Sequence, residues 1–326
     1  MSLGICESKT QEGPTFPIGW FSVARGRDLG VGEVQRIFAF DRELALFRTR
    51  SGAAVVTDAF CPHLGAHLGV EGRVVGETIR CPFHGWKFDA QGECVEIPYC
   101  DDIPERARVR TWNVSETNGD IMVWYHPEEA PPAWEVPVLE ELTSDDWSQP
   151  QYWEFTIPNH VQNIAENTCD PEHFQYVHRM QDTPPSEVNI ADDGRVLHMV
   201  ADASQAVHPN TLDVIMHNPG LAIVRTIYGP GAEMLVYSTA QPTTLEETHM
   251  RWTLTVRKEI VDLVGDDVMR GIKEGIGDDM PIWRHKVYRE KPVFCKGDTS
   301  LVNYRKWVRQ FYIDKSPQPV QEKLAS

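Results

Sequence analysis

Two short loops that each combine a cysteine with a histidine restrict this chain most. The first is Cys61-Pro62-His63, and after 17 further residues the second is Cys81-Pro82-Phe83-His84. Gly65 and Gly85 lie just beyond the histidines, where a tight backbone path around a bulky centre needs them. Two sulfurs and two nitrogens suit a tetrahedral zinc ion or an asymmetric [2Fe–2S] cluster with one iron on the cysteines and the other on the histidines. Each loop mixes the two ligand types, whereas a zinc finger usually groups them, so the pattern favours the cluster.

Cysteine count and charge exclude several classes of protein. Seven cysteines in 326 residues are an odd number in a chain too large to need disulfide staples. The net charge of −17 argues against a nucleic-acid partner. No apolar run approaches the ~20 residues that span a bilayer, and the opening Met1–Thr15 does not resemble a signal peptide. We therefore expect a cytoplasmic protein without a membrane span.

The first part of the chain has the pattern of a small all-β domain. Residues rich in β-branched and aromatic side chains alternate with hairpin residues such as Asp41-Arg42 and Ser51-Gly52. Four proline residues in Pro127–Pro137 then suggest an extended linker. We predict domains at 17–127 and 128–326. Strands are expected in the first at Val34–Phe40, Leu44–Thr49, Ala54–Ala59 and Ile121–Tyr125.

The second part mixes strands with helices. One helical stretch is predicted at Val161–Met180, and another begins near Glu259 and should break or kink at Gly275, Gly277 and Pro281. An α+β domain is therefore expected. Its strands are predicted at Tyr152–Ile157, Arg195–Ala201, Leu212–His217, Ala222–Tyr228, Met234–Ala240 and His249–Val256.

A second possible metal site lies in the first of these helical stretches. Asn167-Thr168-Cys169-Asp170-Pro171-Glu172-His173 is followed by His178. Two imidazoles and one carboxylate can bind Fe(II) on one face and leave the other face open for O₂. A histidine pair on a helix is also common as a surface feature. Because five residues turn an ideal helix by about 140°, a shared metal predicts a π-bulge or a helix break between His173 and His178.

Together, Cys-x-His…Cys-x-x-His and Asn-x-x-Asp-x-x-His-x₄-His resemble the Rieske non-haem iron oxygenases, from Trp20 to about Asp314. The resemblance implies an all-β Rieske domain, followed by an α+β catalytic domain with an antiparallel sheet. It implies a [2Fe–2S] cluster and a mononuclear Fe(II). The expected cluster ligands are Cys61, His63, Cys81 and His84, and the expected ligands of the lone iron include His173 and His178.

The resemblance also assigns roles to nearby polar residues. Asp170 would bridge to a cluster-ligating histidine of a neighbouring subunit, and the competing interpretation is a carboxylate at a helix start. Asn167 would support the iron ligands from outside the coordination sphere. Asp279 matches the third iron ligand, with Asp278 as the alternative. The competing interpretation of Asp279 is a helix cap before Pro281.

Several runs resemble the steroid-acting branch, which contains 3-ketosteroid 9α-hydroxylase oxygenase components and cholesterol 7-desaturases. The predicted function is oxidation of a steroid or sterol C–H bond by O₂. The alternatives are an oxygenase for aromatic or quaternary-amine substrates, a Rieske electron carrier, or a zinc-stabilised lipid-binding module. The runs are CPHLGAHL (61–68), CPFHGWKFDAQGECVEIPY (81–99), IMVWYH (121–126), DMPIWRHKVY (279–288) and RKWVRQFYID (305–314).

The same resemblance implies partners. Gly30-Val31-Gly32 lacks the third glycine of a dinucleotide fingerprint, so this chain is not expected to bind NAD(P)H itself. Electrons from NAD(P)H would reach it through a separate flavin or ferredoxin reductase. A monooxygenase or desaturase in a head-to-tail homotrimer is expected, with one subunit's cluster serving its neighbour's iron. The apolar substrate should face the strands of Arg195–Val256.

Overall fold

Alternating apolar residues build three small antiparallel sheets in the first part of the chain. The computed structural model describes residues 14–204, 210–264 and 267–313. All four strands predicted in the first part are confirmed within two residues at either end. The sheets have the orders β1-β10-β9, β2-β3-β4 and β5-β6-β7-β8. Their strands are β1 (Gly19–Arg25), β2 (Val34–Ala39), β3 (Arg42–Arg48), β4 (Ala54–Asp58), β5 (Arg73–Val75), β6 (Thr78–Arg80), β7 (Lys87–Phe88), β8 (Cys94–Glu96), β9 (Val114–Thr117) and β10 (Asp120–Tyr125).

A seven-stranded antiparallel sheet forms the second part, in the order β11-β17-β16-β15-β14-β13-β12. It confirms the six predicted strands and adds β12, which the sequence analysis missed. Together with the helices that it carries, this sheet confirms the α+β class. Its strands are β11 (Gln151–Ile157), β12 (Ser186–Ile190), β13 (Leu197–Asp202), β14 (Thr211–Asn218), β15 (Leu221–Gly229), β16 (Ala232–Thr244) and β17 (Glu247–Val256).

The helical stretch predicted at Val161–Met180 is interrupted, because the chain forms α1 (Val161–Ala165), the 3₁₀ turn η3 (Glu166–Cys169) and α2 (His173–Tyr176). Proline disfavours helical geometry at the residue before it. Asp170, which precedes Pro171, is accordingly extended, with φ −113° and ψ 90°. At the other end, Arg179 has φ 56°, a left-handed conformation that stops a helix.

The break predicted at Gly275, Gly277 and Pro281 is wrong, because α4 (Asp267–His285) continues through Pro281, and the alternative of a kink there stays a prediction. The proline ring would press on the carbonyl of Gly277, four residues earlier, and a glycine backbone yields easily there. Within the described residues, no helix is long and apolar enough to cross a membrane. The remaining helices and turns are η1 (Gly26–Asp28), η2 (Glu140–Leu142), α3 (Lys258–Val264), α5 (Thr299–Trp307) and η4 (Val308–Phe311).

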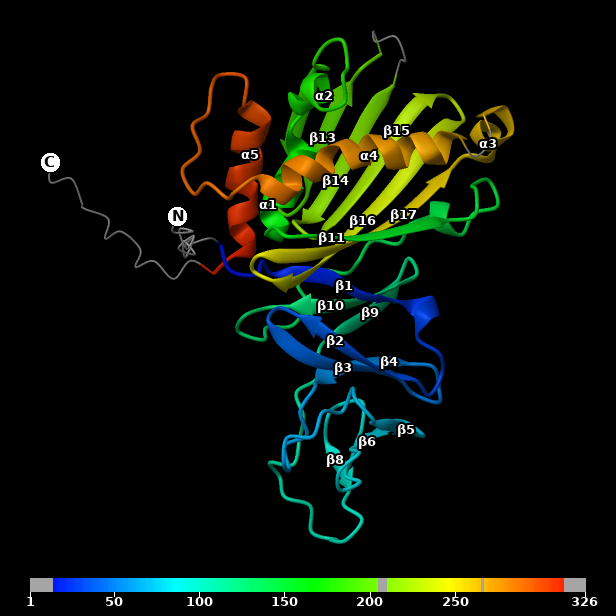
Figure 1. The fold of residues 1–326 in the computed structure, drawn as a ribbon, viewed down its shortest axis with the longest axis vertical. Coiled ribbons are helices and arrows are strands. Elements are labelled where there is room, and N and C mark those ends of the chain that lie inside the picture. The colour runs from blue at the N-terminus through cyan, green and yellow to red at the C-terminus, as the bar shows by residue number, and fades with distance from the viewer. Residues whose placement is uncertain (1–13, 205–209, 265–266, 314–326) are drawn as a thin grey trace, which may run out of the picture.

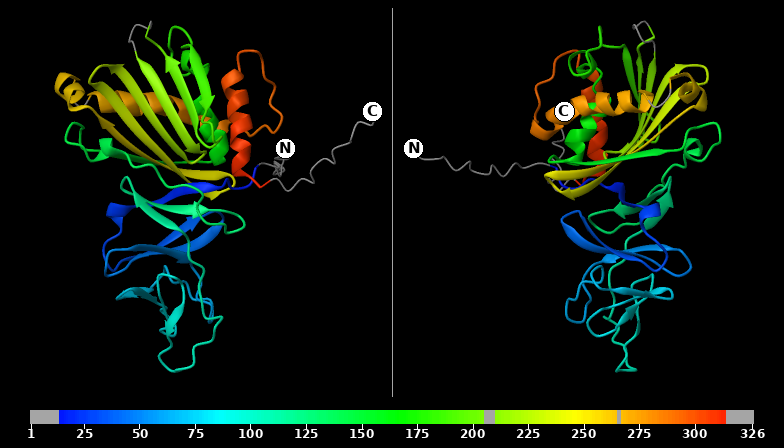
Figure 2. Two further views of the ribbon diagram at one scale, coloured as in Figure 1. Left: turned by 180° about the vertical axis from the view of Figure 1, so that it is seen from behind. Right: turned by 45° about the vertical axis from the view of Figure 1, so that its right-hand side comes forward.

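The molecule is elongated, and the two faces of the large sheet have different neighbours. The small sheets lie below one end of the large sheet, and α4 crosses one of its faces (Figures 1 and 2). On the opposite face, Leu235 and Tyr237 of β16 pack with Trp20 and Met122 of the first part. Because side chains alternate along a strand, the even-numbered residues of β16 face the helices.

Two buried arginines cross between the first part and the large sheet in opposite directions. Arg25 of β1 donates to the Asp120 carboxylate (2.7 Å) and also to the Trp252 carbonyl (3.1 Å) on β17. In return, Arg251 of β17 donates to the backbone carbonyls of β1 at Ser22 (3.0 Å) and Val23 (3.1 Å). Since all these groups are buried, the exchange fixes the first part onto the sheet.

A carboxylate at the edge of this interface completes the arrangement. Arg25 Nε donates to Glu154 of β11 at 2.9 Å. Hydrogen bonding from His249, and then from Arg25, lowers the pKa of Glu154 to about 2. The carboxylate therefore remains ionised at neutral pH and balances the positive charge of the buried Arg25 guanidinium.

We expect Arg25→Met to lower the free energy of unfolding by about 3–5 kcal/mol, because it leaves the Asp120 carboxylate buried without its cation. Urea unfolding measures this change. Arg27→Met is the matched control, since the Arg27 side chain, which pairs with Asp28, is 54% exposed. That variant should remain within about 1 kcal/mol of the parent. Equal effects of the two substitutions would contradict the interpretation.

Candidate metal centres

The two cysteine–histidine loops fold as near-copies of each other. The Gly65 amide donates to the Cys61 carbonyl (2.9 Å), and the Gly85 amide donates to the Cys81 carbonyl (3.2 Å). Both glycines have left-handed φ angles, +75° and +76°, which glycine adopts without strain. The imidazole rings of His63 and His84 come within 4.6 Å, centroid to centroid. The structure thus brings all four predicted cluster residues into two facing loops.

Several observations on these loops fit an iron–sulfur cluster. Burial raises the pKa of the Cys61 thiol to about 12, with the Cys81 thiol adding to the shift, so a thiolate there needs positive charge beside it. His63 Nδ1 is buried without a hydrogen-bond partner among the described residues, as expected of a nitrogen that awaits a metal. Ligands of one zinc ion lie about 3–4 Å apart. These donors do not form such a tight group, which suits a two-iron cluster.

Aromatic side chains hold the loops, and the sequence analysis did not single them out. The Trp86 indole stacks on His63 with 4.6 Å between centroids and an angle of 8°. Its Nε1 donates to the Tyr99 hydroxyl at 2.8 Å. Both aromatics lie within the second quoted run, so their position beside the cluster ligands was the available signal.

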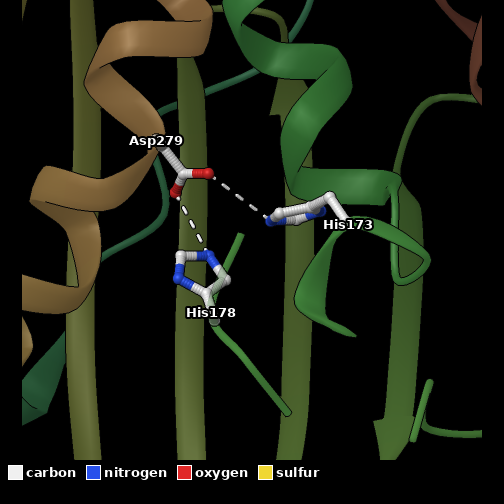
Figure 3. Close-up of side chains that lie close together, drawn as sticks. All are labelled: His173, His178 and Asp279. Carbon is white, nitrogen blue, oxygen red and sulfur yellow. Dashed lines mark ion pairs between the residues drawn. The ribbon is translucent and has the colours of Figure 1, made fainter. Parts of the chain in front are cut away.

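His173, His178 and Asp279 form a second, compact group (Figure 3). Among the described residues, they alone place three possible metal-binding atoms within 4.8 Å of one another. The Asp279 carboxylate lies between the rings, with Oδ1 3.6 Å from His173 Nε2 and Oδ2 3.4 Å from His178 Nε2. The helix break required for a shared metal is present, because α2 ends at Tyr176 and His178 lies beyond it.

The surroundings of His173 prepare it for metal binding. Its Nδ1 is hydrogen-bonded to the Asp170 backbone carbonyl, which places the proton on Nδ1 and leaves the Nε2 lone pair facing Asp279. Burial lowers the pKa of His173, so the neutral imidazole that ligates metals is favoured. Two neutral imidazoles and one carboxylate on one side match a non-haem Fe(II) site.

The remaining predicted residues border this triad. Asn167 Nδ2 lies 3.2 Å from Asp279 Oδ1 and 3.2 Å from His173 Nε2. The Asp170 side chain is 25% exposed, and burial raises its pKa. Of the two adjacent aspartates on α4, Asp279 is buried and faces the histidines, whereas Asp278 is exposed.

A charged network behind the triad was missed by the sequence analysis. Glu166, next to Asn167, is buried and pairs with Arg305 of α5 and with Lys286, whose Nζ is 3.7 Å away. These three residues line a cavity of about 250 Å³ at the surface. They are far apart in sequence, so no local pattern could have grouped them.

Family models cover almost all of the described chain. The Rieske [2Fe-2S] domain matches residues 19–112, and the 3-ketosteroid 9alpha-hydroxylase C-terminal domain matches residues 123–312. The first match contains both cysteine–histidine loops, and the second contains the triad. An electron carrier with a single cluster, or a zinc-stabilised lipid-binding module, does not account for both matches.

Known proteins agree with these matches over nearly the full chain. Cholesterol 7-desaturase of Caenorhabditis elegans is 31% identical, with coverage of 95% of this chain and 80% of the relative. The oxygenase component of 3-ketosteroid-9-alpha-monooxygenase of Rhodococcus rhodochrous is 28% identical, with coverage of 92% of this chain and 83% of the relative. Dicamba monooxygenase shares the fold, with a TM-score of 0.76, 19% identity and coverage of 92% and 98%.

The two metal centres, the order of the domains that hold them and the relatives all agree. A [2Fe–2S] cluster and a mononuclear iron are the cofactors of such chains. This chain belongs to the family of Rieske non-haem iron oxygenases.

Proposed function

We propose that this protein is the terminal oxygenase component of a multicomponent system that oxidises a steroid or sterol C–H bond. The family model over residues 123–312, named for a steroid hydroxylase, carries this proposal. Relatives that are named as sterol desaturase and ketosteroid monooxygenase support it. Those relatives differ in outcome, so hydroxylation and desaturation both lie within the proposal.

The helix-facing side of the large sheet supports an apolar substrate. Directly opposed residues of neighbouring antiparallel strands share a face, so the strand register shows which side chains lie together. Val224 borders two core clusters and yet remains half-buried, which leaves room above the sheet. The apolar residues on this face are Val214, Met216, Ala222, Val224, Val236, Ala240, Met250 and Leu254.

The proposed ligand sets follow the geometry of the two centres. Cys61, His63, Cys81 and His84 would hold the [2Fe–2S] cluster, and His173, His178 and Asp279 would hold the mononuclear iron. When bound, the two centres would supply one-electron transfer and O₂ activation. The chain's own residues fix the ligands, since the Asp170 carbonyl orients His173 and Asn167 donates to Asp279.

The arrangement of the centres supports electron transfer between subunits. The segment between β4 and β8, which carries the cluster loops, lies at the end of the molecule away from the large sheet (Figure 1). The triad lies beside α4 on that sheet, and the molecule is elongated between them. We infer a head-to-tail homotrimer in the cytoplasm, with Asp170 at the contact to the neighbour's cluster. Electrons would come from a separate reductase.

We expect O₂ uptake to depend on a steroid and to yield one oxidised steroid per turnover. The experiment supplies the purified protein with a surrogate ferredoxin reductase and NADH, and offers sterols, 3-ketosteroids, aromatic acids and quaternary amines. Oxygen consumption and mass spectrometry of products measure the outcome. If an aromatic acid or a quaternary amine stimulates O₂ uptake and no steroid does, the proposal of a steroid substrate is wrong.

Asp279→Asn should lower occupancy of the mononuclear iron about 10- to 100-fold while the cluster spectrum remains, because a neutral amide replaces the only anionic ligand. Iron analysis and the visible spectrum measure the two centres separately. Asp278→Asn is the matched control and should leave both unchanged, since Asp278 is exposed. Loss of iron from the Asp278 variant alone would show that the ligand assignment is wrong.

Asp170→Ala should keep both metal centres and lose most turnover. The backbone carbonyl that orients His173 remains in this variant, whereas the carboxylate proposed to meet the neighbouring subunit is removed. Iron and sulfide analysis tests the first part, and single-turnover reoxidation of the cluster tests the second. Normal coupled turnover would remove the proposed bridge.

A further inference from the structure

Ser238 is a polar residue on the apolar face that the proposed function assigns to the substrate. Its neighbours in β16 point to the other side, where Tyr237 packs with Met122 and Thr239 donates to Asp120 at 2.9 Å. Side chains alternate along a strand, so Ser238 faces the helices. It is therefore on the same side of the sheet as the metal triad.

The strand register places Ser238 in a row of residues that runs between η3, the turn before α2, and α4. Met216, Ala222, Ser238 and Trp252 are opposed in turn on β14, β15, β16 and β17 and form one row across the sheet. At one end, Met216 Sδ contacts the Cys169 thiol (3.3 Å) in the turn before Asp170. At the other end, the Trp252 ring lies 6.2 Å, centroid to centroid, from Trp283, one helical turn after Asp279.

Space and unused hydrogen-bonding capacity coincide in this row. Ala222 and Trp252, on either side of Ser238, are buried at 7% and 8% exposure, whereas Ser238 is only half-buried. The hydroxyl of Ser238 has no hydrogen-bond partner among the described residues. The indole nitrogens of Trp252 and Trp283 are also buried without a partner there. These three donors on the helix-facing side of the sheet are therefore without an acceptor among the described residues.

We propose that Ser238 determines substrate specificity by donating a hydrogen bond to the oxygen at position 3 of the steroid. This inference rests on the proposed function, because it takes the steroid as the occupant of the apolar face. A ketone oxygen only accepts hydrogen bonds, so a serine hydroxyl suits it and aliphatic neighbours do not. The remaining contacts of the row are apolar and fit a hydrocarbon ring system.

Binding of two steroids that differ only at position 3 tests the proposal. The probes are 5α-cholestan-3-one and 5α-cholestane, presented in cyclodextrin to the oxygen-free holoenzyme without reductase, with quenching of tryptophan fluorescence as the readout. The parent protein should bind the ketone more tightly. Ser238→Ala should weaken ketone binding about 3- to 10-fold and leave cholestane binding unchanged, because one neutral hydrogen bond is lost.

Thr226→Val is the matched control. Thr226 lies on the same face and is opposed to Met234, four residues along β15 from Ala222 and about 13 Å from the Ser238 row. The Thr226→Val substitution removes a hydroxyl and keeps the shape of the side chain, so the affinities for the ketone and for cholestane should both remain unchanged. Thermal unfolding should show both variants as stable as the parent.

The outcomes separate the two proposals. If the parent prefers the ketone and Ser238→Ala retains that preference, the role of Ser238 is wrong and the steroid proposal stands. If Thr226→Val weakens ketone binding as much as Ser238→Ala does, the ketone responds to the general polarity of the face and not to a specific contact. That result would also overturn the proposed role of Ser238. If the parent binds neither probe, the steroid class fails, and the role of Ser238 fails with it.

Discussion

The reciprocal pair of buried arginines holds the rest of the molecule in place. Arg25 reaches from β1 into the large sheet, and Arg251 reaches back from that sheet to β1. Buried charges of this kind are costly unless every partner is present, so they favour one relative position of the two parts. That position sets the segment between β4 and β8, which carries the cluster loops, at the end of the elongated body away from the large sheet (Figure 2). This separation of the cluster loops from the sheet is the basis of the proposal that a neighbouring subunit supplies electrons to the triad.

A local backbone constraint brings the two histidines of the triad together. Pro171 keeps Asp170 out of helical geometry, and the left-handed Arg179 stops α2 soon after it has begun. On an uninterrupted helix the two histidines would diverge by about 140°. With the helix confined to His173–Tyr176, the rings of His173 and His178 meet, 5.1 Å apart between centroids. Pro171 and the early end of α2 therefore shape the proposed iron site.

Features that depend on nearby residues could be predicted from the sequence, and those that depend on distant packing could not. The cysteine–histidine loops and most strands follow from local spacing and alternation. α4 continues through Pro281, which the rule that proline ends a helix does not anticipate. The partners of Arg25 lie 95 to 228 positions away, so no local pattern points to them. The resemblance alone favours Asp279 over its neighbour Asp278, and the orientation of α4 then separates the buried residue from the exposed one.

The large sheet performs two tasks because its side chains alternate. Along β16, Tyr237 and Thr239 face the first part of the chain, where Thr239 donates to the Asp120 carboxylate that Arg25 also binds. Ser238, between them, lies on the side of the sheet that faces the helices. A change at one position therefore acts on the attachment of the first part, and a change one residue away acts on the face proposed for the substrate. Since a shift of one residue in register would exchange these roles, the pairing of β16 with β15 and β17 constrains both tasks at once. The long, fully paired central strands supply that constraint, which loops of the same composition could not.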